Sequence, residues 1–462
     1  MNDLTALEIA DAVRAGRVGA TAVTEAALAR VAAHDPKLNA FTDLMRERAL
    51  EEAARIDRIV AAGGDPGPLA GVPFAVKNLF DIQGLSTRAG SRINLDRPPA
   101  AVDATSIRRL NDAGAVLLGA LNMGEYAYDF TGENCHYGAS RNPHDPSRMS
   151  GGSSGGSATA VASGMVPFAL GSDTNGSVRV PSSLCGLFGL KPTFGRLSRA
   201  GVFPFCASLD HVGVLARSVA DLAAIYDVMQ GPDPADPACA GRPPEPPAPM
   251  LGRGADGLRI AVAGGYFEAL ADGQALDAVA RAAAALGARR RVEIPQAAIA
   301  RSAAYLITAA EAAALHRDRL RTRPMDFDPD VRDRFFAGSL TPAAWYVQAQ
   351  RFRRWYHRQV ITLFDEIDVI IAPATPCGAP AIGQRTFVAG GETLLVRANL
   401  GVFTQPISFI GLPVVAAPVR QQEALPIGVQ IIAAPWREEY ALRVAGTLER
   451  AGVCVAPVAM RP

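Results

Sequence analysis

A lysine and a segment rich in glycine and serine are the parts of this sequence best suited to chemistry. Lys77 follows the apolar run 73–76, and residues 149–181 read MSGGSSGGSATAVASGMVPFALGSDTNGSVRVP, with Ser153 and Ser177 among the serines. Burial lowers the pKa of a lysine from about 10.4, and a neutral amine is a competent general base near pH 7. Such a lysine could activate a serine hydroxyl without any histidine.

Three other interpretations of these residues fit less well. A Gly/Ser tract is usually a flexible linker, but this one leads directly into a predicted helix. Gly151, Ser153 and Gly155 satisfy G-x-S-x-G, yet a nucleophile elbow needs an apolar strand before it, and the preceding NPHDPSRMS is polar. A lysine in an apolar strand ordinarily snorkels or pairs with an acid. The combination of lysine and serines favours catalysis over all three.

The same segments resemble the signature motifs of the amidase signature enzymes. The matching residues are GVPFAVKNLFDIQG at 71–84, LNMGEYAY at 121–128, GGSSGGS at 151–157, GSDTNGSVRVPSSLCGLFGLKPTFGRLS at 171–198, IIAPATP at 370–376 and PIGVQIIAAPWRE at 426–438. They occur in the family's order, and the resemblance covers nearly the whole chain. It implies the family's α/β fold, a mixed central β-sheet sandwiched between helices, with an N-terminal helical segment.

The resemblance also implies a Ser-Ser-Lys triad that hydrolyses an amide and releases ammonia. Ser177 falls on the nucleophile, Lys77 on the base and Ser153 on the relay, which in the family is associated with a cis peptide bond. The oxyanion hole is expected on four backbone N–H groups, those of Thr174, Asn175, Gly176 and Ser177. Substrate contacts are expected from Gly151, Gly152, Tyr128 and Asn175.

Two positions depart from the family's pattern. Asn175 stands where glycine is usual, which predicts a positive φ that asparagine tolerates better than most residues. Its amide could also select a substrate with adjacent ureido groups. Gly124 stands where aspartate is common, so any contact of that carboxylate is missing, although Glu125 remains.

The substrate is less constrained than the reaction. Closer resemblance to particular members of the family favours a small planar anion as the substrate. Such a substrate needs a cationic partner in the protein, and the helix predicted around 311–321 offers Arg317, Arg319 and Arg321. The alternatives are the A subunit of a tRNA-dependent amidotransferase, which takes ammonia from glutamine, and a hydrolase of another small amide. A catalytically inactive scaffold is disfavoured because all three triad positions are intact.

Composition excludes several other classes of function. Lys plus Arg number 46 and Asp plus Glu 45, so no direct contact with nucleic acid is expected. The six cysteines and six histidines are dispersed, which predicts neither a metal nor a cofactor. Apolar runs such as 369–372 are too short to span a membrane, and no signal peptide is evident, so we expect a cytoplasmic protein. The resemblance implies a homodimer and a small helical companion subunit.

The elements that must position these residues suggest one amidase domain over 1–462. We expect a helical leader at 1–60, a signature core at 61–230, a proline-rich connector at 231–257, a second α/β and helical stretch at 258–365 and a return to the core at 366–462. Short β-rich runs alternate with helical stretches in the core, as in α/β folds. The arginines of the helix expected at 345–364 are predicted to form a solvated face, comprising Arg351, Arg353, Arg354 and Arg358.

Overall fold

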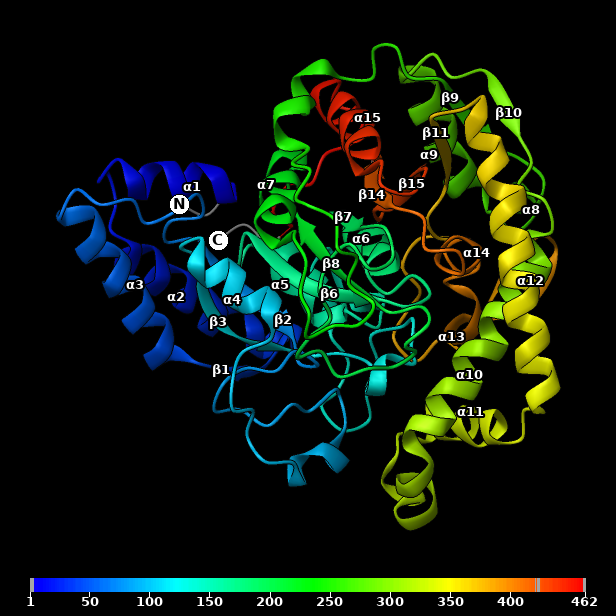
Figure 1. Cartoon of the computed structure of the whole chain (residues 1–462), viewed down its shortest axis with the longest axis horizontal. Helices are drawn as coiled ribbons and strands as arrows, with labels where there is room; N and C mark the ends of the chain where they lie inside the picture. Colours follow the sequence, from blue (N-terminus) through cyan, green and yellow to red (C-terminus); the bar gives the residue numbers. More distant parts are fainter. Residues whose placement is uncertain (1–3, 420, 422–423, 460–462) are drawn as a thin grey trace.

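The computed structural model describes residues 4–419, 421 and 424–459, and one eleven-stranded mixed sheet runs through it (Figure 1). Its strands follow the order β1 (Phe41–Leu44), β3 (Val116–Leu121), β2 (Pro73–Lys77), β6 (Phe168–Asp173), β8 (His211–Ala216), β7 (Phe188–Lys191), β14 (Val414–Val419), β15 (Ile427–Ala433), β11 (Val369–Pro373), β9 (Ile260–Ala263) and β10 (Arg290–Val292). Two small hairpins pair β4 (Arg141–Asn142) with β5 (Asp145–Met149) and β12 (Thr386–Ala389) with β13 (Glu392–Leu395). The predicted α/β fold with a mixed sheet is confirmed.

Helices surround this sheet and connect its strands (Figure 1). Their bounds are α1 Ala6–Arg14, α2 Ala20–Leu38, α3 Arg46–Ala61, α4 Thr105–Asp112, α5 Gly155–Ala162, α6 Arg179–Cys185, α7 Val219–Met229, α8 Tyr266–Ala269, α9 Gly273–Ala285, α10 Ala297–Thr322, α11 Pro329–Ser339, α12 Ala343–Ile361, α13 Val396–Asn399, α14 Gln405–Ser408 and α15 Glu438–Arg450. The N-terminal helices are as expected, but β1 interrupts them. Only Phe41 of that strand is buried, so alternation could not reveal it.

Three neighbouring strands, β3, β2 and β6, run parallel to one another. Every residue of the three is buried, which is why they appear in the sequence as nearly continuous apolar runs. The rings of Phe74 and Phe168 stack between β2 and β6 with centroids 5.3 Å apart. Because the strands are parallel, their carboxyl ends meet at one edge of the sheet, where open α/β sheets bind ligands.

Helix α10 is the one helix of the described residues whose length and composition alone would allow it to span a membrane. An 18-residue window of this helix has a mean hydropathy of 1.2, and 44% of the window is buried inside the protein. The helix packs against α11, α12 and α14. Its buried side chains are mostly alanines, as expected for a helix in close contact with other helices.

Candidate active site

The carboxyl ends of β2 and β6 carry the polar residues at the centre of the site. Lys77 is the last residue of β2, and Ser172 and Asp173 end β6. The segment after β3 approaches the same edge and contains Tyr128 and Asp129. Strand topology thus brings together residues that lie far apart in the sequence.

Lys77 is completely buried between two serines. Its Nζ lies 2.6 Å from Ser153 Oγ and 2.9 Å from Ser172 Oγ. Burial lowers the pKa of Lys77 to about 7, although the carboxylates of Asp210 and Asp173 oppose that shift. An amine of this pKa is available as a base near neutral pH.

The two candidate serines lie in adjoining loops. Ser153 follows a cis peptide bond to Gly152, as the family resemblance implied, and lies two residues before the start of α5. Ser177 lies in the loop between β6 and α6 and is 2% exposed. The backbone N–H of Ser154 donates to the carbonyl oxygen of Ser177 at 3.3 Å, which joins the two loops. The catalytic roles of these residues stay predictions.

Four successive backbone N–H groups, at residues 174–177, donate no hydrogen bond to any residue that the structure describes. Such free donors suit a developing oxyanion. The positive φ predicted for Asn175 is wrong. It belongs to Gly176, with φ of +137°, where a Cβ would lie 2.0 Å from Thr404 Oγ1. Close contact with Thr404 therefore requires glycine at 176, one residue later than expected.

A buried ion pair stabilises the loop that carries residues 174–177. Arg179 Nη2 and Asp173 Oδ1 are 2.9 Å apart, and both side chains are fully buried. Asp173 also accepts a hydrogen bond from the N–H of Val178 at 3.2 Å. Burial would raise the pKa of Asp173, but Arg179 outweighs that effect and holds the pKa below its usual value. The carboxylate thus holds both ends of the loop that carries Ser177.

A small cavity opens on Ser177 and contains one cation, Arg334 of α11. The guanidinium lies 3.8 Å above the ring of Tyr128, and its Nη1 donates to the Tyr128 carbonyl oxygen at 2.7 Å. Its Nε donates to the hydroxyl of Tyr305 at 3.0 Å. No carboxylate within the described ranges pairs with Arg334. Asp129 also lines the cavity, but it pairs with Arg397, so Arg334 is available to bind an anion.

The arginines proposed from the sequence for this purpose do not reach the cavity. Arg317 and Arg321 are exposed and lie near Asp318, whereas Arg319 contacts the rings of Tyr126 and Phe203. Those candidates are wrong because helix periodicity alone does not show which helix covers the site. Arg334 lies outside every motif, so no sequence signal distinguishes it from its neighbours.

The expected substrate-contact residues divide into two groups. Tyr128 and Asn175 line the cavity. Gly151 and Gly152 are not among its lining residues, because Gly151 packs on Pro181 and Gly152 on the backbone of Gly132. Their contact with substrate stays a prediction.

Gly124 has a steric explanation. A Cβ at this position would lie 2.5 Å from the Cβ of Asp129, so Asp129 occupies the space of the side chain that residue 124 lacks. Asp129 accepts hydrogen bonds from Thr131 and Gly132 and pairs with Arg397 at 2.7 Å. A carboxylate is thus present near this position, supplied from five residues later in the chain.

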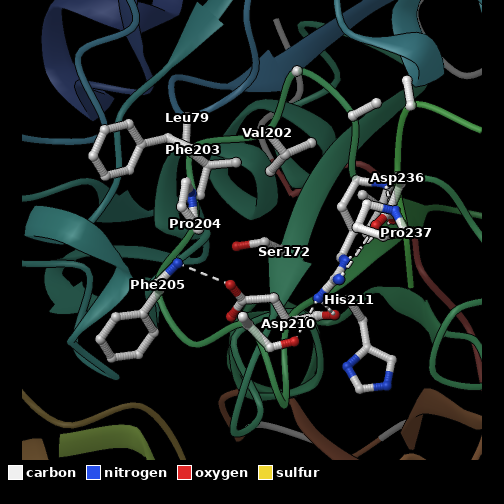
Figure 2. A pocket seen from close by; sticks show the side chains of 16 residues that line it. Leu79, Ser172, Val202, Phe203, Pro204, Phe205, Asp210, His211, Asp236 and Pro237 are labelled. Carbon is white, nitrogen blue, oxygen red and sulfur yellow. Dashed lines mark hydrogen bonds and ion pairs between the residues drawn. The ribbon is translucent and has the colours of Figure 1, made fainter. Parts of the chain in front are cut away.

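Ser172 lines a second cavity (Figure 2). Asp210 lines this cavity. Its carboxylate accepts hydrogen bonds from the N–H of Phe205 at 2.8 Å and from the hydroxyl of Thr174 at 2.6 Å. His211 also lines it, but its Nδ1 contacts two backbone carbonyl oxygens, and burial lowers its pKa well below the usual value. His211 is poorly placed to serve as a catalytic base.

These features are those expected of an amidase, and the chain belongs to the amidase family, whose model matches residues 22–442. Of the proteins it is similar to, the AtzE chain of the 1-carboxybiuret hydrolase of Pseudomonas sp. (strain ADP) is 54% identical over 97% of this chain and 98% of the relative. The A subunit of the glutamyl-tRNA(Gln) amidotransferase of Roseiflexus sp. (strain RS-1) is 38% identical over 97% of this chain and 96% of the relative.

Solved structures agree with the sequence comparison. One, described as a vestigial protein complex that reveals the evolutionary origins of an s-triazine catabolic enzyme, matches with a TM-score of 0.97 and 54% identity over 98% of this chain and all of that chain. A bacterial aryl acylamidase of the amidase signature family matches with a TM-score of 0.89 and 26% identity, over 97% of this chain and 96% of that one. The predicted family and fold are confirmed.

Proposed function

We propose that this amidase hydrolyses 1-carboxybiuret, a small anionic amide, and releases ammonia. The observation that carries the proposal is the guanidinium of Arg334, which shares a small cavity with Ser177 and has no described acidic partner. The 54% identical relative is named for the same substrate. A carboxylate meeting Arg334 would orient the amide toward the nucleophile.

In the proposed mechanism, neutral Lys77 removes the Ser177 proton through Ser153 while Ser177 Oγ attacks the amide carbonyl carbon. The oxyanion forms against the free N–H groups of residues 174–177. The C–N bond then breaks as the same relay returns the proton to nitrogen, and ammonia leaves. Water, deprotonated by the relay, next attacks the acyl-enzyme ester and regenerates Ser177.

The runner-up function is glutamine hydrolysis within a tRNA-dependent amidotransferase, which the 38% identical relatives favour. Ammonia release by the purified chain from carboxybiuret, glutamine and malonamide separates the candidates. We expect the highest kcat/KM with carboxybiuret. A preference for glutamine would overturn the proposal in favour of the runner-up, and a preference for malonamide would indicate another small-amide hydrolase.

Arg334 provides a matched test of anion recognition. Replacing it by methionine should raise KM for carboxybiuret by about 10- to 100-fold, because a charge-assisted hydrogen bond contributes roughly 1.5–3 kcal/mol. Hydrolysis of neutral malonamide should change far less. The control is Arg319→Met, which removes an arginine outside the cavity. Equal losses on the charged and the neutral amide would contradict anion recognition by Arg334.

The rate should depend on pH through Lys77. Because burial places its pKa at about 7, we expect kcat/KM to rise as pH increases through about 7, where the amine loses its proton. Lys191 is the control, since burial lowers its pKa to about 7 as well, yet among the described residues its Nζ bonds only the Pro192 carbonyl oxygen. Lys191→Met should keep the acid limb of the profile. Loss of that limb in this variant would assign it to Lys191.

Asn175 is expected to select the substrate. Its Nδ2 donates to Thr308 Oγ1 at 3.0 Å, whereas its buried Oδ1 has no described partner and can accept an N–H of a ureido group. Asn175→Gly should therefore lower kcat/KM for carboxybiuret selectively, with a simple aliphatic amide as the comparison substrate. Equal changes on both substrates, or none, would make the residue structural.

The assembly and surroundings of the chain are part of the same proposal. The vestigial protein complex containing a 54% identical chain supports a companion chain here too. We propose in addition a homodimer, a cytoplasmic location, and activity without a metal, another cofactor or nucleic acid. Purification from the native host as a lone, fully active monomer would contradict the companion chain and the homodimer.

A further inference from the structure

The inner face of α12 holds a loop of the active site. Gln350 Nε2 lies 3.3 Å from Ser208 Oγ, and Arg353 Nη2 donates to the Ser208 carbonyl oxygen at 2.8 Å. Tyr346 contacts the same loop indirectly, because its hydroxyl bonds Glu311 of α10 at 2.9 Å and Glu311 accepts the N–H of Ser208 at 3.0 Å. Arg353 is therefore not on a solvated face, contrary to the sequence prediction.

The loop held in this way, residues 203–210, forms part of both cavities. Phe205 lines the Ser177 cavity and packs on the ring of Tyr128, with centroids 4.9 Å apart. Asp210 bonds Thr174, the first of the four free backbone donors. A displacement of α12 would consequently reach the substrate cavity through a single loop.

The outer face of α12 combines aromatic and basic side chains and lies at the edge of the molecule (Figure 1). Trp355 on this face is 44% exposed. Arg351 and Arg358 lie one turn before and one turn after Trp355. Neither arginine forms an ion pair within the described part of the chain, and α12 contains no acidic residue. The outer face of α12 is thus aromatic and carries positive charge that no acidic side chain of the described residues neutralises.

We propose that this outer face docks an acidic amphipathic helix of the companion chain. The unpaired arginines attract carboxylates, and an exposed tryptophan flanked by arginines is a typical anchor of protein interfaces. A membrane is a poorer fit, because Arg351 and Arg358 occupy the centre of the face, where a membrane-bound helix would present apolar residues. The inference rests on the companion chain proposed above and adds its location and chemistry.

Docking here also regulates the active site. The helix that receives the companion on one face holds residues 203–210 with the other, so an occupied outer face restricts the loop that carries Phe205. The companion chain thereby acts on the substrate cavity without contributing a residue to it.

Tryptophan fluorescence tests the docking directly, because Trp355, one of the three tryptophans in the chain, lies on this face. The probe is a synthetic 21-residue amphipathic helix with leucine on one face and glutamate beside it, added to the whole enzyme. We expect a blue shift that saturates with peptide, and none with a peptide in which lysine replaces glutamate. An equal response to both peptides, or no response, would overturn the proposal.

Two double variants of equal charge change locate the site. Arg351→Glu/Arg358→Glu should weaken peptide binding at least tenfold, whereas Arg317→Glu/Arg321→Glu, on exposed residues beside Asp318 of α10, should not. Equal weakening would show that the net charge rather than this face binds the peptide. A blue shift with vesicles of phosphatidylglycerol and phosphatidylcholine in place of the acidic peptide would assign the face to a membrane instead.

Hydrogen exchange tests the regulation. Bound peptide should slow exchange of the amides of residues 203–210 at least threefold, in addition to those of α12. Slowing confined to α12 would overturn the coupling. Neither fluorescence nor exchange depends on the substrate, so failure of docking is distinguishable from failure of the proposed reaction.

Discussion

Replacing Ser177 by alanine is expected to abolish amide hydrolysis while leaving the protein folded. The variant loses the nucleophile, and the free N–H groups of residues 174–177 cannot replace it. Lys77→Ala should be equally inactive, since the base and the nucleophile act as a unit. We expect kcat to fall by at least about 10⁴-fold in each variant, and the double variant to be no worse than either. Ammonia release measured over hours checks this.

The control for these variants is Ser157→Ala, a buried serine of α5 whose hydroxyl bonds the Leu170 carbonyl oxygen at 3.0 Å. Its activity should stay near that of the wild type. Replacing His211 should also leave the chemistry largely intact, unlike in a serine-histidine hydrolase. Retention of roughly a tenth of the wild-type rate by a folded Ser177 or Lys77 variant would refute the triad.

The largest change in stability is expected from Arg179→Met. This substitution leaves the carboxylate of Asp173 buried without its counter-charge and removes donors to Gln430 and Ser408. Breaking a buried pair in this way costs about 3–5 kcal/mol, because the remaining charge is neither solvated nor paired. The free energy of unfolding should fall by that amount, as measured by equilibrium unfolding in urea.

Two comparisons make the Arg179 result specific. The double variant Asp173→Asn/Arg179→Met should recover part of the loss, since no charge is then left buried. Arg259→Met breaks an ion pair of the same length, 2.9 Å to Asp368, but Arg259 is half exposed, so the loss should stay below about 1 kcal/mol. Similar losses for Arg179→Met and Arg259→Met would show that burial of the pair at Asp173 does not matter.

The sequence by itself determined the family and the α/β fold, and it predicted the residue types of the candidate triad. Strands β2 and β6 were predictable because both are buried on two faces, which leaves apolar runs at 73–76 and 166–170, shortly before Lys77 and Asp173. The short strand β1 was not, because a single buried side chain produces no periodic pattern.

Only the tertiary structure decided which cation shares the cavity with Ser177 and where the strained glycine lies. Helices α10 and α11 both carry arginines, and helical periodicity is a local property, so choosing Arg334 over Arg319 required the packing of α11 over the edge of the sheet. Similarly, glycine is required at 176 rather than at 175, because residue 176 has positive φ and Thr404, distant in the sequence, leaves no room for a Cβ there. Contacts between distant segments, which local sequence patterns do not encode, made both choices.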